Sequence, residues 1–251
     1  MDKLIYTVNN TINNIYDNRS IRAQNLSNVN VPGYRKDLTN GSSGTAFLNN
    51  LDVLQSRGFS LGVDENLFER SPGQIKQTDE DLDISIRGDG YFFSKGEGEI
   101  ALTRRGDMSL DSDGFLVNGT NSRILDVNLN PISVPAHSKL VVVDNGDIII
   151  EPINAPPGTK QTVATIGMTM AAGIQLKKFP DGEIRPDDGS VPQPDQLPRI
   201  IQGYIEQSNV NIVDELVNSI EEQRQYDINI KMIASAKEID EGGAGLMRLP
   251  S

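Results

Sequence analysis

The chain has 251 residues and carries 35 acidic against 23 basic side chains, a formal charge of -12 at neutral pH. A nucleic-acid-binding protein needs a basic surface to displace counterions from phosphates, so the sequence predicts no nucleic-acid partner. The chain has no cysteine and one histidine, His137, which excludes disulfides, thiolate nucleophiles and cysteine-bound metals. No apolar run reaches the roughly 18 residues of a membrane helix, and the N-terminus lacks the features of a cleaved secretory signal. We therefore expect no membrane span, no metal and no cofactor.

The N-terminal segment has apolar residues at alternating spacings of three and four. This heptad pattern predicts an amphipathic helix from about residue 3 to about residue 29, ended by Pro32 and Gly33. Two arginines interrupt an otherwise apolar line along one side of the helix. The line consists of Ile5, Val8, Ile12, Ile15, Arg19, Arg22, Leu26 and Val29.

The C-terminal segment predicts a second long helix, capped by Asn209 or Asn211 and ending near Glu241, where glycines begin. Its broad apolar face also contains two polar residues, Gln223 and Asp227. A second apolar line appears on the opposite side from residue 228 onward, and a helix apolar on two sides needs neighbours on two sides. The broad face consists of Ile212, Val213, Leu216, Val217, Ile220, Ile230, Ile233 and Ala234.

The middle of the chain has the signals of short β-strands. Leu82, Ile84 and Ile86 alternate with polar residues, a Gly-Asp-Gly turn follows at 88–90, and residues 141–150 have the pattern of a hairpin. Turns every eight to twelve residues predict an antiparallel β domain, followed by a proline-rich loop over 186–199.

The predicted fold class is α+β: a central antiparallel β-rich domain with long N- and C-terminal α-helices packing as a coiled coil. Residues 1–38 and 203–251 would form a discontinuous helical assembly domain. Residues 39–81 would be a connector, and residues 82–202 the β-rich domain.

Isolated motifs for catalysis or metal binding are weak. Asp111–Gly114 resembles the start of a calcium loop, but Ser122 stands where that loop needs an acidic residue, which favours a β-turn. His137 has no identifiable nucleophile beside it, so we interpret it as a surface loop residue. An acidic cluster at Asp79, Glu80, Asp81 and Asp83 could supply catalytic carboxylates, but the start of a solvated strand is the better interpretation.

Several ordered segments resemble bacterial flagellar rod and hook proteins. Residues 23–35, A-Q-N-L-S-N-V-N-V-P-G-Y-R, resemble that family's N-terminal signature, approximately A-x-N-L-A/S-N-x-x-T-P-G-Y/F-K/R. Residues 88–92, 103–106 and 110–117 are similar to its GDGFF, YTRxG and LDxDGxLV segments, and residues 203–211 resemble its C-terminal motif. Val31 replaces the usual threonine, and Leu102 stands where tyrosine commonly precedes Thr-Arg.

The resemblance implies a non-enzymatic subunit of the flagellar basal-body rod in the periplasm. The opening M-D-K-L-I-Y-T and the D-E-G at 240–242 look like the proximal-rod type; the alternatives are a distal-rod or hook subunit or, from another class, an acidic periplasmic hydrolase. Implied partners are copies of the chain, other rod proteins above and below, and the flagellar export apparatus, with Phe47 and Leu51 in an export motif. The expected assembly interface combines the N-terminal line of eight residues with Val213, Leu216, Ile220, Asp227, Ile230 and Ile233.

Antiparallel helices whose ends near Val29 and Asn211 are level would place Arg19 opposite residues 221–225. We therefore predict that Arg19 or Arg22 pairs with Glu221, Glu222 or Asp227, within the chain or across to a neighbour, and sets the register. The alternative is two solvated arginines in a groove that faces water.

Overall fold

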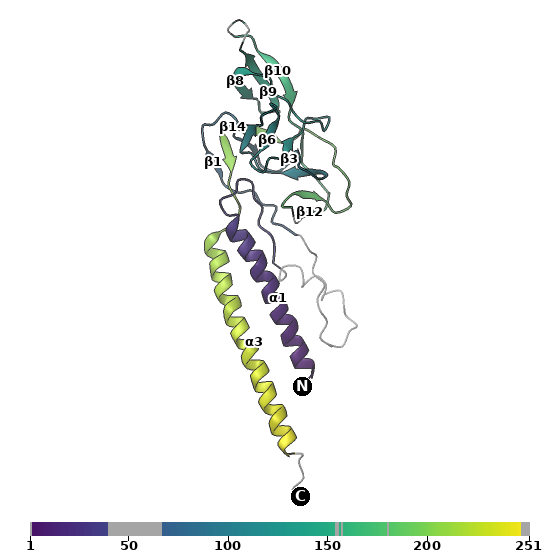
Figure 1. Cartoon of the computed structure of the whole chain (residues 1–251), viewed down its shortest axis with the longest axis vertical. Coiled ribbons are helices and arrows are strands. Elements are labelled where there is room, and N and C mark those ends of the chain that lie inside the picture. The colour runs from purple at the N-terminus through teal and green to yellow at the C-terminus, as the bar shows by residue number, and fades with distance from the viewer. Residues whose placement is uncertain (1, 40–66, 154–155, 157, 180, 247–251) are drawn as a thin grey trace. The chain divides into compact units, whose positions relative to one another are not determined.

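The structure is a computed structural model that describes residues 2–39, 67–153, 156, 158–179 and 181–246 (Figure 1). It divides into two compact units. The helical unit contains the described residues 2–27, 37–39 and 211–246, and the β body contains residues 28–36 and the described part of 67–210. The two ends of the chain therefore belong to the same unit.

Two long helices that lie side by side and antiparallel form the helical unit (Figure 1). Helix α1 spans Asp2–Ser27 and α3 spans Ile212–Leu246. The Oδ1 atom of Asn211 caps α3 by accepting the N–H of Val213 at 3.0 Å, so Asn211 rather than Asn209 is the cap. The prediction that this helix ends near Glu241 is wrong, because it continues to Leu246. Each glycine in this stretch costs helix stability, but none adopts the positive φ of a left-handed cap that would end the helix.

All strand pairs of the β body are antiparallel, which confirms the predicted sheet type. The largest sheet has the order β12 (Leu176–Lys178), β13 (Ile184–Pro186), β4 (Ile100–Thr103), β3 (Tyr91–Lys95), β7 (Arg123–Ile124), β6 (Leu116–Asn118) and β5 (Met108–Leu110), with β11 (Met168–Thr169) also on β3. A three-stranded sheet has the order β10 (Gln161–Thr165), β9 (Asp147–Pro152) and β8 (His137–Val142). Two further pairs are β14 (Arg199–Gln202) with β2 (Ile84–Arg87), and β1 (Ile75–Gln77) with β15 (Tyr204–Glu206).

The predicted hairpin is present as β8 and β9, with Val141 opposite Ile149. Two boundaries differ from the sequence expectation. Strand β1 lies inside the predicted connector, and the proline-rich loop leads to β14 and β15 before α3 begins. Both β1 and β15 are three-residue strands, too short for a period of two to stand out in a sequence. His137 begins β8 and is not in a loop.

Strand β3 separates two apolar clusters because successive side chains of a strand point to opposite faces. Phe92 packs with Ile84, Ile124 and Ile150, whereas Phe93 packs with Leu102. Both phenylalanines are fully buried. The β body thus has an apolar core on each face of this strand.

Candidate functional site

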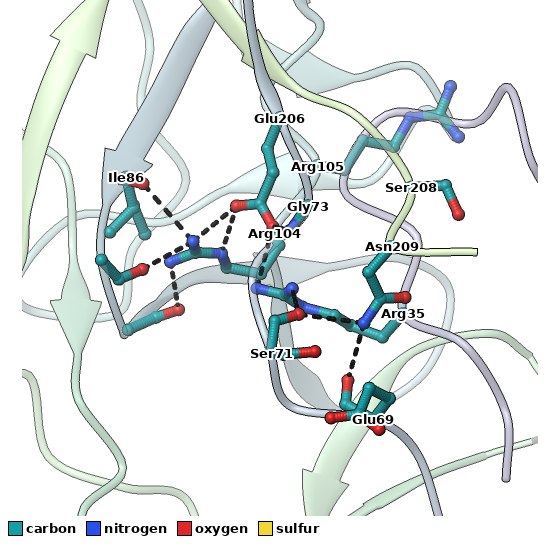
Figure 2. Close-up of polar contacts among 12 residues, drawn as sticks. Arg35, Glu69, Ser71, Gly73, Ile86, Arg104, Arg105, Glu206, Ser208 and Asn209 are labelled. Carbon is teal, nitrogen blue, oxygen red and sulfur yellow. Dashed lines mark hydrogen bonds and ion pairs between the residues drawn. The ribbon is translucent and has the colours of Figure 1, made fainter. Parts of the chain in front are cut away.

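Three of the segments that resemble rod and hook proteins, at 23–35, 103–106 and 203–211, meet in one buried polar cluster, formed by Arg35, Arg104, Glu206 and Asn209 (Figure 2). We call it the clasp. Its residues come from the start, the middle and the end of the β body's sequence. All three ionisable groups are at most 3% exposed.

Glu206 is the acceptor at the centre of the clasp. Its Oε2 accepts the Nε–H of Arg104 at 2.7 Å, and its Oε1 lies 2.9 Å from Nη2 of Arg35. The Gly73 N–H also donates to Oε1, at 2.9 Å. One buried carboxylate therefore holds two guanidinium groups and a backbone amide, the kind of satisfied arrangement that a buried charge requires.

Arg104 uses its other N–H groups to hold the turn before β3. Its Nη1 donates to the carbonyl of Gly90 at 2.9 Å, and its Nη2 donates to the carbonyl of Gly88 at 2.7 Å (Figure 2). The predicted Gly-Asp-Gly turn is thus confirmed, but it joins strands of different sheets instead of closing a hairpin. This contact joins that turn to the Thr-Arg-Arg-Gly segment.

The N-terminal segment enters the clasp through Gly33 and Arg35. Gly33 has φ of 68° and donates its N–H to the Glu206 carbonyl at 2.7 Å, and a Cβ there would meet the Arg104 carbonyl at 2.4 Å. Only glycine fits this approach. Burial lowers the pKa of Arg35, an effect that the carboxylate of Glu206 opposes.

Asn209 connects three backbone segments. Its Oδ1 accepts the N–H of Lys36 at 2.7 Å. Its Nδ2 donates to the carbonyls of Ser71 at 2.9 Å and Glu69 at 3.2 Å (Figure 2). Because residues 33–36 and 206–209 bond directly to each other, the clasp holds together the two places where the chain leaves the β body for α1 and α3.

The carboxylate of Glu206 is fully engaged by fixed donors, so the clasp holds segments of the β body together. The acidic cluster at 79–83 does not form a second site: Asp79, Glu80 and Asp81 are exposed, as a solvated strand start predicts. The Asp111–Gly114 turn is confirmed by a hydrogen bond from the Gly114 N–H to the Asp111 carbonyl at 3.1 Å.

Among the described residues, no group of three His, Asp or Glu side chains is placed to hold a metal ion. No helix in this part of the chain has the length and apolar character needed to cross a membrane.

The contact between α1 and α3, which we call the helix seam, is largely polar. Arg22 donates from Nε to Glu222 at 2.7 Å and from Nη1 to Glu215 at 3.0 Å, which confirms the predicted pairing of Arg22 with Glu222. Arg19 instead donates to the amide oxygen of Gln223 at 2.6 Å. The Arg22 side chain is 12% exposed, so the alternative of a solvated arginine is wrong for this residue.

An aromatic contact extends the helix seam, and amide side chains form further hydrogen bonds beside it. The rings of Tyr16 and Tyr226 meet edge to face with centroids 6.0 Å apart, and Arg19 lies 5.4 Å from the Tyr226 centroid. Near the end of α1, Asn25 makes two 2.9 Å hydrogen bonds to the backbone of Asp37. Asp227, expected as an arginine partner, accepts from Gln223 on its own helix at 3.1 Å.

The predicted N-terminal line faces α3 in part. Val8 and Ile15 are buried, and the intermediate positions are Ile12, Arg19, Arg22 and Leu26. Val29 lies in the turn after α1, in the β body. Ile5 lies on α1, but its side chain is outside the described residues, as are Phe47 and Leu51.

The predicted broad face of α3 does not meet α1. Val213, Leu216, Ile220, Asp227 and Ile230 are all exposed, and only Ile233 of the expected set is half-buried. The buried positions of α3 are instead Glu215, Glu222, Asn229 and Ala236. Hydrophobic periodicity finds the apolar side of a helix but does not say whether the partner of that side is in the same chain.

Sequence reasoning missed the clasp. Arg35, Arg104, Glu206 and Asn209 each lie inside a segment that resembles the family, so those segments were the available signal. A lone acid at position 206 offers no charge partner nearby in the sequence, because its partners are about 100 and 170 residues away. Only the tertiary fold brings them together.

The clasp joins the terminal segments of the β body through buried charged groups. Residues 85–167 match the family described as the flagellar hook protein FlgE/F/G D1 domain, and residues 201–246 match the flagellar basal body rod FlgEFG protein C-terminal family. The chain is 27% identical to FlgF of Salmonella typhimurium over 97% of both chains. It is 31% identical to FlgG of Borreliella burgdorferi over 85% of this chain and 87% of that protein, and 28% identical to FlgG of Bacillus subtilis over 95% and 97%.

The chain therefore belongs to the flagellar basal-body rod protein family. Its members are structural proteins of the flagellar basal-body rod and serve motility, and that rod is the location of this chain. The expected resemblance is confirmed.

Proposed function

We propose that the chain is a subunit of the proximal rod that polymerises through its terminal helices and forms part of the axial drive shaft in the periplasm. In this proposal α1 and α3 pack as a coiled coil together with helices of other copies and of other rod proteins above and below. The observation that carries it is the exposed apolar surface of α3.

Nine of the sixteen exposed large hydrophobic side chains among the described residues lie on α3. They are Ile212, Val213, Leu216, Val217, Ile220, Ile228, Ile230, Met232 and Ile239. Burying each fully is worth about 1.5–3 kcal/mol relative to leaving it in water. Apolar surface gathered on one helix in this way supports a partner-binding role.

The proximal-rod type is supported by the opening and the residues at 240–242, and by the similarity to FlgF over nearly the whole chain. The similarity to FlgG at comparable identity keeps the distal rod as the second candidate. Detection of the chain by a specific antibody in purified basal bodies that have been stripped of the hook and distal rod tests this choice. Its loss together with the distal rod would contradict the proximal position.

We also propose export of the unfolded chain through the flagellar export apparatus. The absence of cysteine supports this route, since no disulfide could form on arrival in an oxidising compartment. Phe47 and Leu51 remain the proposed export motif.

The experiment that tests polymerisation is Ile15→Asp. This variant places a carboxylate at a position only 3% exposed in the helix seam, where desolvation opposes its charge. We expect the variant to be secreted at the parent level but to be absent from basal bodies, with motility lost. Ile15→Leu is the matched control and should assemble. Normal incorporation of Ile15→Asp would contradict assembly through these helices, and failure of secretion would show that this segment serves export instead.

The hydrolase alternative has its own test. Glu80→Gln with Asp83→Asn removes two acids of the cluster at 79–83, and we expect the double variant to assemble and support motility as the parent does. Loss of function with normal assembly would revive a catalytic role.

A further inference from the structure

Positions along the helix seam are spaced by seven residues on both helices. On α1 they are the buried Val8 and Ile15 and the 12%-exposed Arg22, and on α3 they are the buried Glu215, Glu222, Asn229 and Ala236. A helix pair with this repeat presents nearly the same backbone geometry after a slip of one heptad, about 10.5 Å. The backbone repeat alone therefore does not select one alignment over its neighbours.

The chemistry along the α3 line does differ from one heptad to the next. Glu215 is fully buried and Glu222 is 6% exposed, whereas the following positions are an amide and a methyl group. Arg22 sits between the two carboxylates and bonds to both. At the other end of α1, Val8 is 3% exposed and suits an apolar neighbour such as Ala236.

A slip in either direction breaks this match. Shifting α1 by seven residues toward the C-terminus of α3 would put Arg22 between Glu222 and Asn229, so one of its two carboxylates would be replaced by an amide. Shifting it the other way would put Arg22 beside Glu215 and position 208, which precedes the start of α3 at Ile212. In both cases Arg22 keeps one charge partner and loses the other.

We propose that Arg22 selects the register of α1 against α3 by binding two carboxylates one heptad apart. A guanidinium can serve both because its N–H donors fan out in a fixed plane, which a lysine ammonium cannot reproduce. The role is one of positioning within the chain and does not depend on the proposed polymerisation.

Disulfide trapping in the purified full-length chain tests the proposal, and the chain's lack of cysteine makes each introduced pair unique. Tyr16→Cys with Tyr226→Cys reports the observed register. Tyr16→Cys with Ile233→Cys reports a slip of one heptad toward the C-terminus of α3, and Tyr16→Cys with Ser219→Cys reports the opposite slip. Each pair is oxidised in the parent background and with Arg22→Leu, Arg22→Lys or the exposed control Arg224→Leu.

We expect the 16–226 disulfide to dominate in the parent and in Arg224→Leu. In Arg22→Leu the ratio of the 16–226 disulfide to the slipped disulfides should fall by about tenfold or more, which corresponds to the free energy of one charged hydrogen bond. In Arg22→Lys the ratio should lie between those of the parent and Arg22→Leu. Equal loss of all three disulfides in Arg22→Leu would show that the residue holds the helices together without choosing a register, and would overturn the proposal. An unchanged ratio in Arg22→Leu, no preference in the parent, or a parent-like ratio in Arg22→Lys would overturn it as well.

Discussion

In the β body, Phe92, Ile124 and Ile150 have no exposed surface, whereas on α3 Val213, Ile220 and Ile239 expose more than half of theirs. In the helical unit it is charged side chains that are buried, since Glu215 and Glu222 lie in the helix seam. The β body thus buries its large core side chains within the chain, whereas α3 leaves large apolar side chains exposed. A unit built in the second way has less buried apolar surface with which to stabilise itself.

Hydrogen exchange should show the largest difference between the two units. A two-helix contact that buries mostly polar groups offers little to offset ordering entropy. In dilute monomer we expect the amides of α1 and α3 to exchange on the order of 1,000-fold faster than those of β3 and β9, a gap of about 4 kcal/mol. Mass spectrometry after deuterium exchange measures this, and equal protection in the two units would refute the comparison.

Glu206→Ala should produce the next largest effect, confined to the β body. The variant leaves the buried cations Arg35 and Arg104 without their carboxylate, which we expect to cost about 3–5 kcal/mol of unfolding free energy. Urea denaturation followed by near-ultraviolet circular dichroism measures the loss. The exposed Glu97→Ala is the control, expected within about 0.5 kcal/mol of the parent; a similarly small change for Glu206→Ala would mean that the clasp is not structural.

Leu216→Ser and Ile150→Ala contrast the exposed and buried apolar residues. Ile150→Ala should cost about 2–5 kcal/mol in the β body. Leu216→Ser, at a side chain 51% exposed, should change monomer stability by no more than about 0.5 kcal/mol yet reduce incorporation into basal bodies. A monomer destabilised by Leu216→Ser would show that this face is already covered within the chain.

A pH dependence of the β body should be the smallest effect. Glu183 accepts hydrogen bonds from Ser94 and Ser122, each at 3.1 Å, and burial raises the pKa of its carboxyl group above the usual 4.5. A raised pKa in the folded state favours the protonated form, so this contribution is complete below the unfolded pKa and is lost as pH rises through the folded one. As the pH rises from acidic to neutral, the free energy of unfolding should therefore fall less for Glu183→Gln than for the parent. The measurement is urea denaturation at several pH values, and identical pH profiles would exclude Glu183 as the source.

The helices and the hairpin were predictable because their signals are local. Heptad spacing in residues 5–26 and the turn between Val141 and Ile150 depend on neighbours a few residues apart, and both elements are present. The end of α3 was not predictable in this way, because glycines permit a helix to end without requiring it. Strand β1 escaped prediction since three exposed residues carry no periodic signal.

By itself, the sequence determined the two long helices, the hairpin of β8 and β9, the antiparallel sheet type, the family and the height at which the arginines of α1 meet the acids of α3. Each of these depends on periodicity, on a local motif or on helix rise, which are properties of short segments. Only the tertiary structure decided that Glu206 closes the β body and that the apolar side of α3 faces away from α1. Both outcomes depend on tertiary contacts between residues that are distant in the sequence. Those contacts, and not the neighbours along the chain, set the free energy of burying a charge or a side chain.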